Sequence, residues 1–252
     1  MLLAIDLGNT SIHLAVLKNS KVIKVYYFDK TISTSAFKIK LLQTLKIIKR
    51  NHNAIADIIV CSVVPPLNHI VRGQIKNIFK INPLFVGEDI IVPIKNNYKN
   101  PKQVGQDRLV CAYATKCLYG APAIVIDLGT AITLDAVSKS GAYEGGIIVP
   151  GIRLSFESLF RKTALLPKIN NIEAPRKLIG KDTVTSMLSG IFYGYGEMLV
   201  GLIDRISRQL KGRPRVIVTG GYLYLMKRFI AHKIHKIDRD LVFKGMALLS
   251  SK

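Results

Sequence analysis

The chain has 252 residues, enough for one large domain or two of about 120 residues each. Hydrophobic residues make up 49% and charged residues 21%, a balance that excludes a disordered chain. No stretch approaches the ~20 uninterrupted apolar residues that a bilayer crossing needs, and the start lacks the basic leader and cleavage site of a signal peptide. The composition therefore predicts a cytoplasmic protein with no membrane partner.

The net charge of +21 comes from 37 Lys and Arg against 16 Asp and Glu. Such a charge makes attraction to nucleic acid or to anionic surfaces physically plausible. The lysines are spread along the chain, however, and no basic tract with interleaved aromatic residues accompanies them. We therefore favour a solvated basic surface over a dedicated nucleic-acid site, which the charge by itself does not exclude.

The cysteines and histidines show no redox or metal-binding pattern. Cys61, Cys111 and Cys117 lie in apolar stretches without Cys-x-x-Cys spacing, which predicts core residues in a reducing compartment. His232 and His235 are three residues apart, but two ligands without a third acid or thiol make a poor zinc site.

The first elements in chain order recur half a chain later. Residues 5–16 read as an apolar strand ending in Asp, a turn centred on Gly and a second strand, and residues 126–137 repeat this pattern 121 residues further on. Each copy predicts a β-hairpin with a carboxylate near its tip, Asp6 in the first and Asp127 in the second.

Strand-like and helix-like patterns alternate through the rest of the chain. Apolar residues at helical spacing predict helices over 36–50, 67–80, 106–118 and 182–210. Apolar runs predict strands over 56–64, 83–86 and 215–219, with a loop over 87–104 and a glycine-rich stretch over 141–151. This alternation predicts an α/β fold of two duplicated lobes, residues 1–115 and 116–252, with a cleft between them.

The hairpin tips suit phosphate chemistry. Glycine lets backbone N–H groups approach a phosphate oxygen, a Thr or Asn side chain adds a donor, and the Asp can hold a cation or its hydration shell. One such turn is weak support, because any Asp-Gly turn between strands looks similar. Two copies favour a clamp on two phosphates, and since no P-loop or Gly-x-Gly-x-x-Gly turn occurs, any nucleotide has to bind there.

A third candidate segment runs from Tyr98 to Arg108 and enters a helix near Gln106. Asp107 then lies in the first helical turn, where free N–H groups stabilise its anion. In phosphoryl transfer a carboxylate only has to orient the hydroxyl and accept its proton, and Arg108 could bind a substrate carboxylate. The alternative is an ordinary helix-start acid beside a surface Arg.

Taken in order, these segments resemble type III pantothenate kinases, a branch of the acetate-kinase/actin/hexokinase superfamily with a duplicated ribonuclease H-like fold. The matching stretches span residues 2 to about 245. They are Asp6-Leu7-Gly8-Asn9-Thr10, Ser62-Val63-Val64-Pro65-Pro66, Tyr98, Asn100-Pro101, Gly105-Gln106-Asp107-Arg108, Asp127-Leu128-Gly129-Thr130, Gly145 to Gly151, Gly180-Lys181-Asp182-Thr183 and Thr219-Gly220-Gly221.

The resemblance implies phosphorylation of pantothenate by ATP, the first step of coenzyme A biosynthesis, in a homodimer whose interface helps close the substrate pocket. It implies Asp107 as the proton acceptor and Asp127 as the ligand of a monovalent cation, K⁺ or NH₄⁺, required beside Mg²⁺ with ATP. The implied ATP-binding residues are Asp6, Leu7, Gly8, Asn9, Thr10, Ser11, Ile12, His13 and Thr130. The implied substrate-binding residues are Tyr98, Gly105, Gln106, Asp107, Arg108 and Thr183.

Two positions depart from the family pattern. Gln106 stands where Ala is more common and adds bulk, and Asp182 stands where Asn is usual and adds a negative charge beside Thr183. Two alternatives stay open: a regulator like the Bvg accessory factors of the same family, associated with nucleic acid, and a kinase of another small hydroxy acid.

Overall fold

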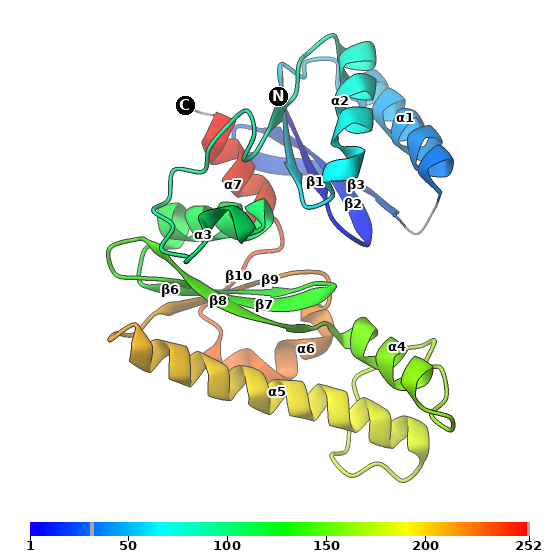
Figure 1. Ribbon diagram of the computed structural model, residues 1–252, viewed down its shortest axis with the longest axis vertical. Helices are drawn as coiled ribbons and strands as arrows, with labels where there is room; N and C mark the ends of the chain where they lie inside the picture. The colour runs from blue at the N-terminus through cyan, green and yellow to red at the C-terminus, as the bar shows by residue number, and fades with distance from the viewer. Residues whose placement is uncertain (31–32, 251–252) are drawn as a thin grey trace. The chain divides into compact units, whose positions relative to one another are not determined.

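The computed structural model describes residues 1–30 and 33–250, which form two compact units (Figure 1). The first unit contains Met1–Ile94, Lys99–Ala114 and the chain from Asp240 onward. The second contains Lys95–Tyr98 and Thr115–Arg239. Each unit is built around its own five-stranded sheet.

The sheet of the first unit has the order β3-β2-β1-β4-β5. Its strands are β1 (Leu2–Leu7), β2 (Ser11–Lys18), β3 (Lys21–Asp29), β4 (Asp57–Ser62) and β5 (Leu84–Phe85). Strand β1 pairs antiparallel with β2 and parallel with β4. Its residues Leu2 to Ile5 are apolar on both faces and buried, as expected of a central strand covered on both sides.

Helices α1 (Thr34–Asn51) and α2 (Pro65–Phe79) pack their apolar stripes into the core beside this sheet. The side chain of Ser33 caps α1 by accepting the N–H of Ala36 at 3.3 Å. Pro65 opens α2, so the two prolines that close the preceding strand also begin the helix, two residues earlier than predicted.

The second sheet repeats the same connectivity, in the order β10-β9-β6-β7-β8. Its strands are β6 (Ala123–Leu128), β7 (Ala131–Val137), β8 (Tyr143–Pro150), β9 (Arg215–Thr219) and β10 (Lys236–Ile237). Strand β6 pairs antiparallel with β7 and parallel with β9, as β1 does with β2 and β4. The predicted duplicated α/β architecture is confirmed, and the glycine-rich stretch 141–151 proves to contain strand β8.

The register corrects the spacing of the repeat. Leu7 pairs with Ile12 across the first hairpin, and Leu128 pairs with Ile132 across the second. The offset is therefore 121 residues for the first strands (128 minus 7) but 120 for the second strands (132 minus 12). The turn of the first hairpin is one residue longer, so Ala15 rather than Leu14 corresponds to Asp135.

The last helix belongs to the first unit. Helix α7 (Leu241–Ser250) packs against β1, β4 and β3, and Leu241, Phe243 and Met246 are buried. The predicted lobe 116–252 placed these residues with the second half of the chain. Periodicity shows that a helix is amphipathic or apolar but not which sheet it covers. The sequence therefore did not show that the chain returns to the first unit at its last helix.

Helix α3 (Gln106–Tyr119) contributes its first residues to the first unit, after a 3₁₀ turn at Pro101–Gln103. In the second unit, α4 (Ile152–Lys162), α5 (Thr183–Gln209) and α6 (Leu223–Ile230) form a core with the sheet, followed by a 3₁₀ turn at Ala231–Lys233. Among the described residues, α5 is the one helix long and apolar enough to cross a membrane. Core helices pass the same test, and Phe192, Leu199 and Ile203 of α5 lie in this core.

Candidate active site

The tip of the first hairpin presents a half-buried carboxylate. Asp6, near the end of β1, lies opposite His13 of β2 and Cys61 of β4. The N–H of Gly8 donates to the carbonyl of Ser11 at 3.1 Å and closes the turn. A Cβ on Gly8 would lie 2.9 Å from that carbonyl oxygen, so a side chain here would open the turn.

Strand alternation separates the predicted ATP-binding residues into two groups. The side chains of Ser11 and His13 hydrogen bond at 2.9 Å on the Asp6 side of the sheet. Burial lowers the pKa of His13, against an opposing effect of Asp29. Leu7 and Ile12 are fully buried in the core, so any contact they make with a nucleotide has to use their backbone.

The segment before α3 brings a second carboxylate into the same unit. Asp107 Oδ1 accepts the N–H of Arg108 at 2.8 Å, and it would lie 2.5 Å from a Cβ placed on Gly105. Burial raises the pKa of the Cys61 thiol, and the charges of Asp6 and Asp107 raise it further. Both carboxylates therefore lie within electrostatic reach of one buried residue.

Gln106 directs its side chain toward Gly87. A Cβ on Gly87 would lie 2.6 Å from the Gln106 side chain, and Gly87 has a φ of +86°. The side chain of Gln106, which is longer than the usual Ala, thus packs against the backbone that follows β5. Its predicted role in substrate binding stays a prediction.

The second hairpin carries its candidate residues in the second unit. Asp127 is half-buried and Thr130 is exposed. Two glycines from distant segments enclose this turn: a Cβ on Gly220 would lie 2.4 Å from Asp127 Oδ1, and a Cβ on Gly151 would lie 2.2 Å from the Thr130 carbonyl oxygen. Gly220 has a φ of +96°, which also favours glycine. Sequence reasoning treated Gly151 and Gly220 only as members of glycine motifs and missed their packing around Asp127.

Two predicted substrate-binding residues also belong to the second unit. Tyr98 is half-buried and lies against β8, where a Cβ on Gly145 would lie 3.4 Å from its ring. Thr183 is the exposed first residue of α5. Asp182 caps that helix by accepting the N–H of Thr185 at 2.8 Å, and this hydrogen bond lowers the pKa of Asp182.

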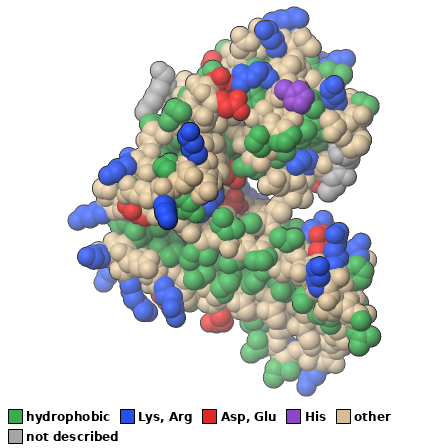
Figure 2. All heavy atoms as spheres, viewed as in Figure 1, with side chains coloured by type: hydrophobic (Ala, Val, Ile, Leu, Met, Phe, Trp, Pro, Cys, Tyr) green, Lys and Arg blue, Asp and Glu red, His purple; other side chains and the backbone are tan. Residues whose placement is uncertain are grey.

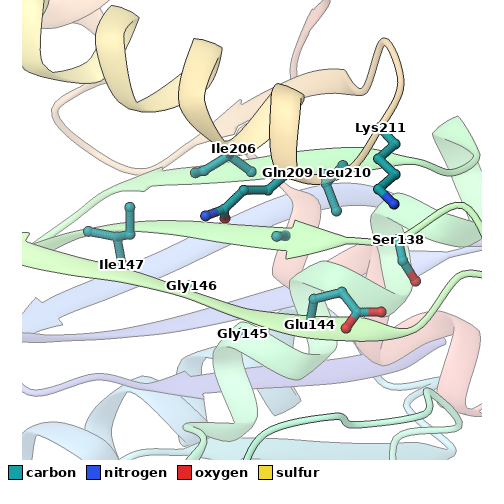
Figure 3. Close-up of a pocket in the computed structure, with 10 residues that line it drawn as sticks. Ser138, Glu144, Gly145, Gly146, Ile147, Ile206, Gln209, Leu210 and Lys211 are labelled. Atoms are coloured by element: carbon teal, nitrogen blue, oxygen red, sulfur yellow. The ribbon is translucent and has the colours of Figure 1, made fainter.

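Among the described residues, the second unit lines a larger and a smaller cavity. The larger, about 760 Å³, is lined by residues from α4, α5 and the segment before α5, including Thr183 and Asp182. The smaller, about 410 Å³, lies between β7, β8 and the end of α5, where Figure 3 shows Glu144, Ile147, Ile206 and Lys211 around it. Only the larger cavity contains a predicted site residue, Thr183.

Within residues 1–30 and 33–250, no group of three or more His, Cys, Asp or Glu side chains could hold a metal ion. Asp127 offers one carboxylate, so a monovalent cation there would take its other oxygens from backbone, water or nucleotide.

Positive charge is distributed over both units. On the face shown in Figure 2, Lys and Arg side chains project from each unit, with uncharged surface between most of them. Cys61 and Cys111 are buried as predicted, whereas Cys117 is exposed, because it lies on an outward face of α3.

Comparison with known proteins decides the family. The model of the type III pantothenate kinase family matches residues 2–205. A type III pantothenate kinase of Persephonella marina is 44% identical over 223 residues, covering 88% of this chain and 87% of the relative. The chain belongs to the type III pantothenate kinase family. Members of this family phosphorylate pantothenate in coenzyme A biosynthesis, and the predicted enzyme class, a kinase, is confirmed.

Solved structures support the fold of this pantothenate kinase family member. A Campylobacter jejuni protein assigned to the Baf family of transcriptional activators has a TM-score of 0.61 at 20% identity, covering 99% of this chain and 97% of that one. A Sinorhizobium meliloti protein assigned as a 2-dehydro-3-deoxygalactonokinase has a TM-score of 0.58 at 13% identity, covering 99% and 96%. At these identities the likeness concerns the fold alone, and the predicted actin/hexokinase-like fold class is confirmed.

Proposed function

We propose that this chain transfers the terminal phosphoryl group of ATP to pantothenate, giving ADP and 4′-phosphopantothenate. The family match supports this activity over nearly the whole chain. The observation that carries it to particular residues is that Asp6, at the tip of the first hairpin, and Asp107, in the first turn of α3, belong to one unit.

In this reaction the substrate hydroxyl attacks the terminal phosphorus of ATP, and the bond to ADP breaks. Asp107 accepts the hydroxyl proton, because its carboxylate is held at the start of α3 by the N–H of Arg108. Arg108 binds the substrate carboxylate through its forked donors. Tyr98, Gly105, Gln106 and Thr183 complete the predicted substrate contacts.

Residues 6–13 and Thr130 are the predicted contacts of ATP. The backbone N–H groups of turns 8–10 and 129–130 are suited to phosphate oxygens. Mg²⁺ bound with ATP would neutralise phosphate charge, and Asp127 would hold the monovalent cation.

We further propose that the enzyme acts as a homodimer in the cytoplasm. Free thiols on the described residues support a reducing compartment. Large apolar side chains are exposed on the second unit around α4 and the start of α5, which supports association there. They are Leu154, Phe160, Leu165, Leu178, Ile179 and Val184.

A coupled assay of ADP release tests the proposal. We expect release to require pantothenate and ATP together and to rise when K⁺ or NH₄⁺ replaces Na⁺. Other small hydroxy acids serve as competing substrates, and a higher kcat/KM for one of them would reassign the substrate. No pantothenate-stimulated ADP release, together with salt-sensitive retention of DNA, would favour the regulator.

Asp107→Asn tests the proton acceptor. The amide keeps the shape of the side chain but cannot take the proton, so kcat should fall by about 10²–10⁴-fold. The pantothenate dissociation constant and the melting temperature should change little. A kcat near that of the unchanged enzyme would remove Asp107 from the mechanism.

A further inference from the structure

The second unit buries a carboxylate that the first unit lacks. Asp135, in the middle of β7, is 2% exposed, and its counterpart in the first sheet is Ala15. A buried carboxylate is costly unless hydrogen bonds compensate it, so its retention in one copy of a duplicated sheet calls for a role specific to that copy. The mechanism above does not use Asp135.

Hydrogen bonds connect Asp135 to Tyr143 and to Thr133. Tyr143 donates its hydroxyl to Asp135 Oδ1 at 2.7 Å, within the protein interior. Thr133 donates its hydroxyl to Asp135 Oδ2 at 3.2 Å. Thr133 lies directly opposite Asp127 across the hairpin, so Asp135 stands between the Asp127 turn and Tyr143.

Tyr143 in turn fixes the short segment that carries Tyr98. The N–H of Tyr143 donates to the Lys95 carbonyl at 2.8 Å, and its carbonyl accepts the N–H of Asn97 at 2.9 Å. The rings of Tyr98 and Tyr143 lie 6.4 Å apart between centroids, at 41°. Tyr143 is fully buried, so its ring is a fixed surface for Tyr98 to pack against.

Neighbouring residues of β8 reinforce this placement. The side chain of Glu144 accepts two hydrogen bonds from the Asn97 amide, at 3.0 and 3.1 Å. Gly145 leaves room for the Tyr98 ring. Residues 95–98 thereby belong to the second unit although the chain on both sides of them belongs to the first.

We propose that Asp135 and Tyr143 are positioning residues that set the place of Tyr98 for substrate binding. This inference rests on the proposed function, in which Tyr98 contacts pantothenate. Loss of the Tyr143 hydroxyl frees the Tyr143 ring and loosens Tyr98, whereas Asp107 and the nucleotide turns keep their local structure. The effect should therefore appear in the KM for pantothenate and not in the KM for ATP.

The chain offers a matched control. Tyr119 donates its hydroxyl to Asp238 at 2.6 Å, and Asp238 follows β10 at the opposite edge of the same sheet. Tyr119→Phe and Tyr143→Phe each remove one oxygen from a Tyr-Asp pair in the same unit. If Tyr143 has only a structural role, both substitutions should lower the melting temperature and leave the KM for pantothenate and the KM for ATP unchanged.

The experiment measures kcat and both KM values for the unchanged enzyme, Tyr143→Phe, Tyr119→Phe, Tyr98→Ala and the double variant Tyr98→Ala/Tyr143→Phe. We expect Tyr143→Phe to raise the pantothenate KM about 3–10-fold, with kcat within about twofold, and Tyr119→Phe to leave it unchanged. In the Tyr98→Ala background the effect of Tyr143→Phe should vanish, since coupled residues are non-additive. Asp135→Ala, which removes the acceptor and places there the residue of the equivalent position Ala15, should reproduce the raised KM if a variant at Tyr143 folds poorly.

The outcomes separate the two proposals. An unchanged enzyme without pantothenate-dependent activity overturns the proposed function itself. The positioning role alone is overturned if the enzyme is active but Tyr143→Phe and Asp135→Ala have the same pantothenate KM as Tyr119→Phe. Full additivity of Tyr98→Ala and Tyr143→Phe overturns it too.

Discussion

A glycine lies against each of two predicted site carboxylates. Gly105 approaches Asp107 in the first unit, and Gly220 approaches Asp127 in the second. In each case a Cβ would fall within 2.5 Å of a carboxylate oxygen, closer than atoms can approach. These glycines therefore fix where the carboxylates lie, in addition to allowing the backbone to turn.

Gly105→Ala should impair catalysis without unfolding the protein. The new methyl group meets the end of a flexible side chain, so the Asp107 carboxylate moves aside at little cost in stability. A displacement of about 1 Å at a reacting group can reduce kcat about 10²-fold. Steady-state kinetics and thermal unfolding measure the two effects separately.

Gly73→Ala is the control for this substitution. Gly73 lies in α2 of the same unit, with nothing within 4 Å of an added Cβ. Alanine there should leave kcat unchanged and stabilise the helix by about 0.5–1 kcal/mol. Equal kcat values for the Gly105 and Gly73 variants would show that Asp107 tolerates the added methyl group.

At the scale of elements, the start of α5 combines a structural cap with a predicted substrate contact. Asp182 accepts the N–H of Thr185, and the Thr185 hydroxyl accepts the N–H of Asp182, which closes a capping box next to Thr183. Asp182, which stands where the family usually has Asn, thus has a structural role as a helix cap. Its lowered pKa keeps it charged well into the acid range, so the cap is lost only when the pH falls through that lowered value.

Asp182→Asn and Asp182→Ala separate the cap from the charge. Asn caps a helix about as well as Asp, so Asp182→Asn should keep the melting temperature while Asp182→Ala lowers it. Both remove a negative charge beside Thr183, and both should lower the pantothenate KM in low salt, with the difference shrinking in high salt. An unchanged KM would place the substrate carboxylate away from this helix start.

At the scale of the whole molecule, the first unit is completed by the last helix of the chain. Phe243 of α7 is 5% exposed, and Gly245 lets α7 approach α3 so closely that a Cβ would lie 2.5 Å from Val110. The core of the first unit is therefore incomplete until residues 241–250 have been made. This arrangement makes the C-terminal helix a stability determinant of the N-terminal sheet.

Phe243→Ala should destabilise the protein by about 3–5 kcal/mol, because it leaves a cavity in that core. Phe243→Leu, which keeps most of the apolar volume, should cost less. Urea unfolding monitored by circular dichroism gives both values. If both substitutions lower the free energy of unfolding no more than a substitution at an exposed position does, α7 is not part of the folded core in solution.

If the exposed apolar surface of the second unit forms the proposed homodimer interface, charged residues placed on it should dissociate the dimer. Leu165 is 91% exposed and Ile179 is 72% exposed. Glu at both positions should shift the molecular mass by light scattering from two chains to one, because a buried charge at an interface is costly. The matched change Tyr27→Glu, at an exposed position of the first unit, should leave the mass unchanged.

Local sequence was enough to predict the elements that have strong patterns. The two Asp-Gly hairpins, helix α5 and strand β9 follow from apolar periodicity and glycine turns, which depend on neighbours in the chain. Strand β3 and helices α4, α6 and α7 were not predicted; the three helices are short, with 11, 8 and 10 residues. The one-residue difference between the hairpins was overlooked although Ile12 and Ile132 are 120 residues apart in the sequence, and the pairing register shows it directly.

The sequence by itself determined the duplicated α/β plan, the kinase family and the residues near each turn, since motif order and periodicity are properties of a linear chain. Only the tertiary structure decided that α7 joins the first sheet, that Gly220 lies against Asp127 and that Tyr143 joins Asp135 to the Tyr98 segment. These contacts join residues far apart in sequence or on adjacent strands. They depend on which surfaces exclude water together, which a single sequence does not specify.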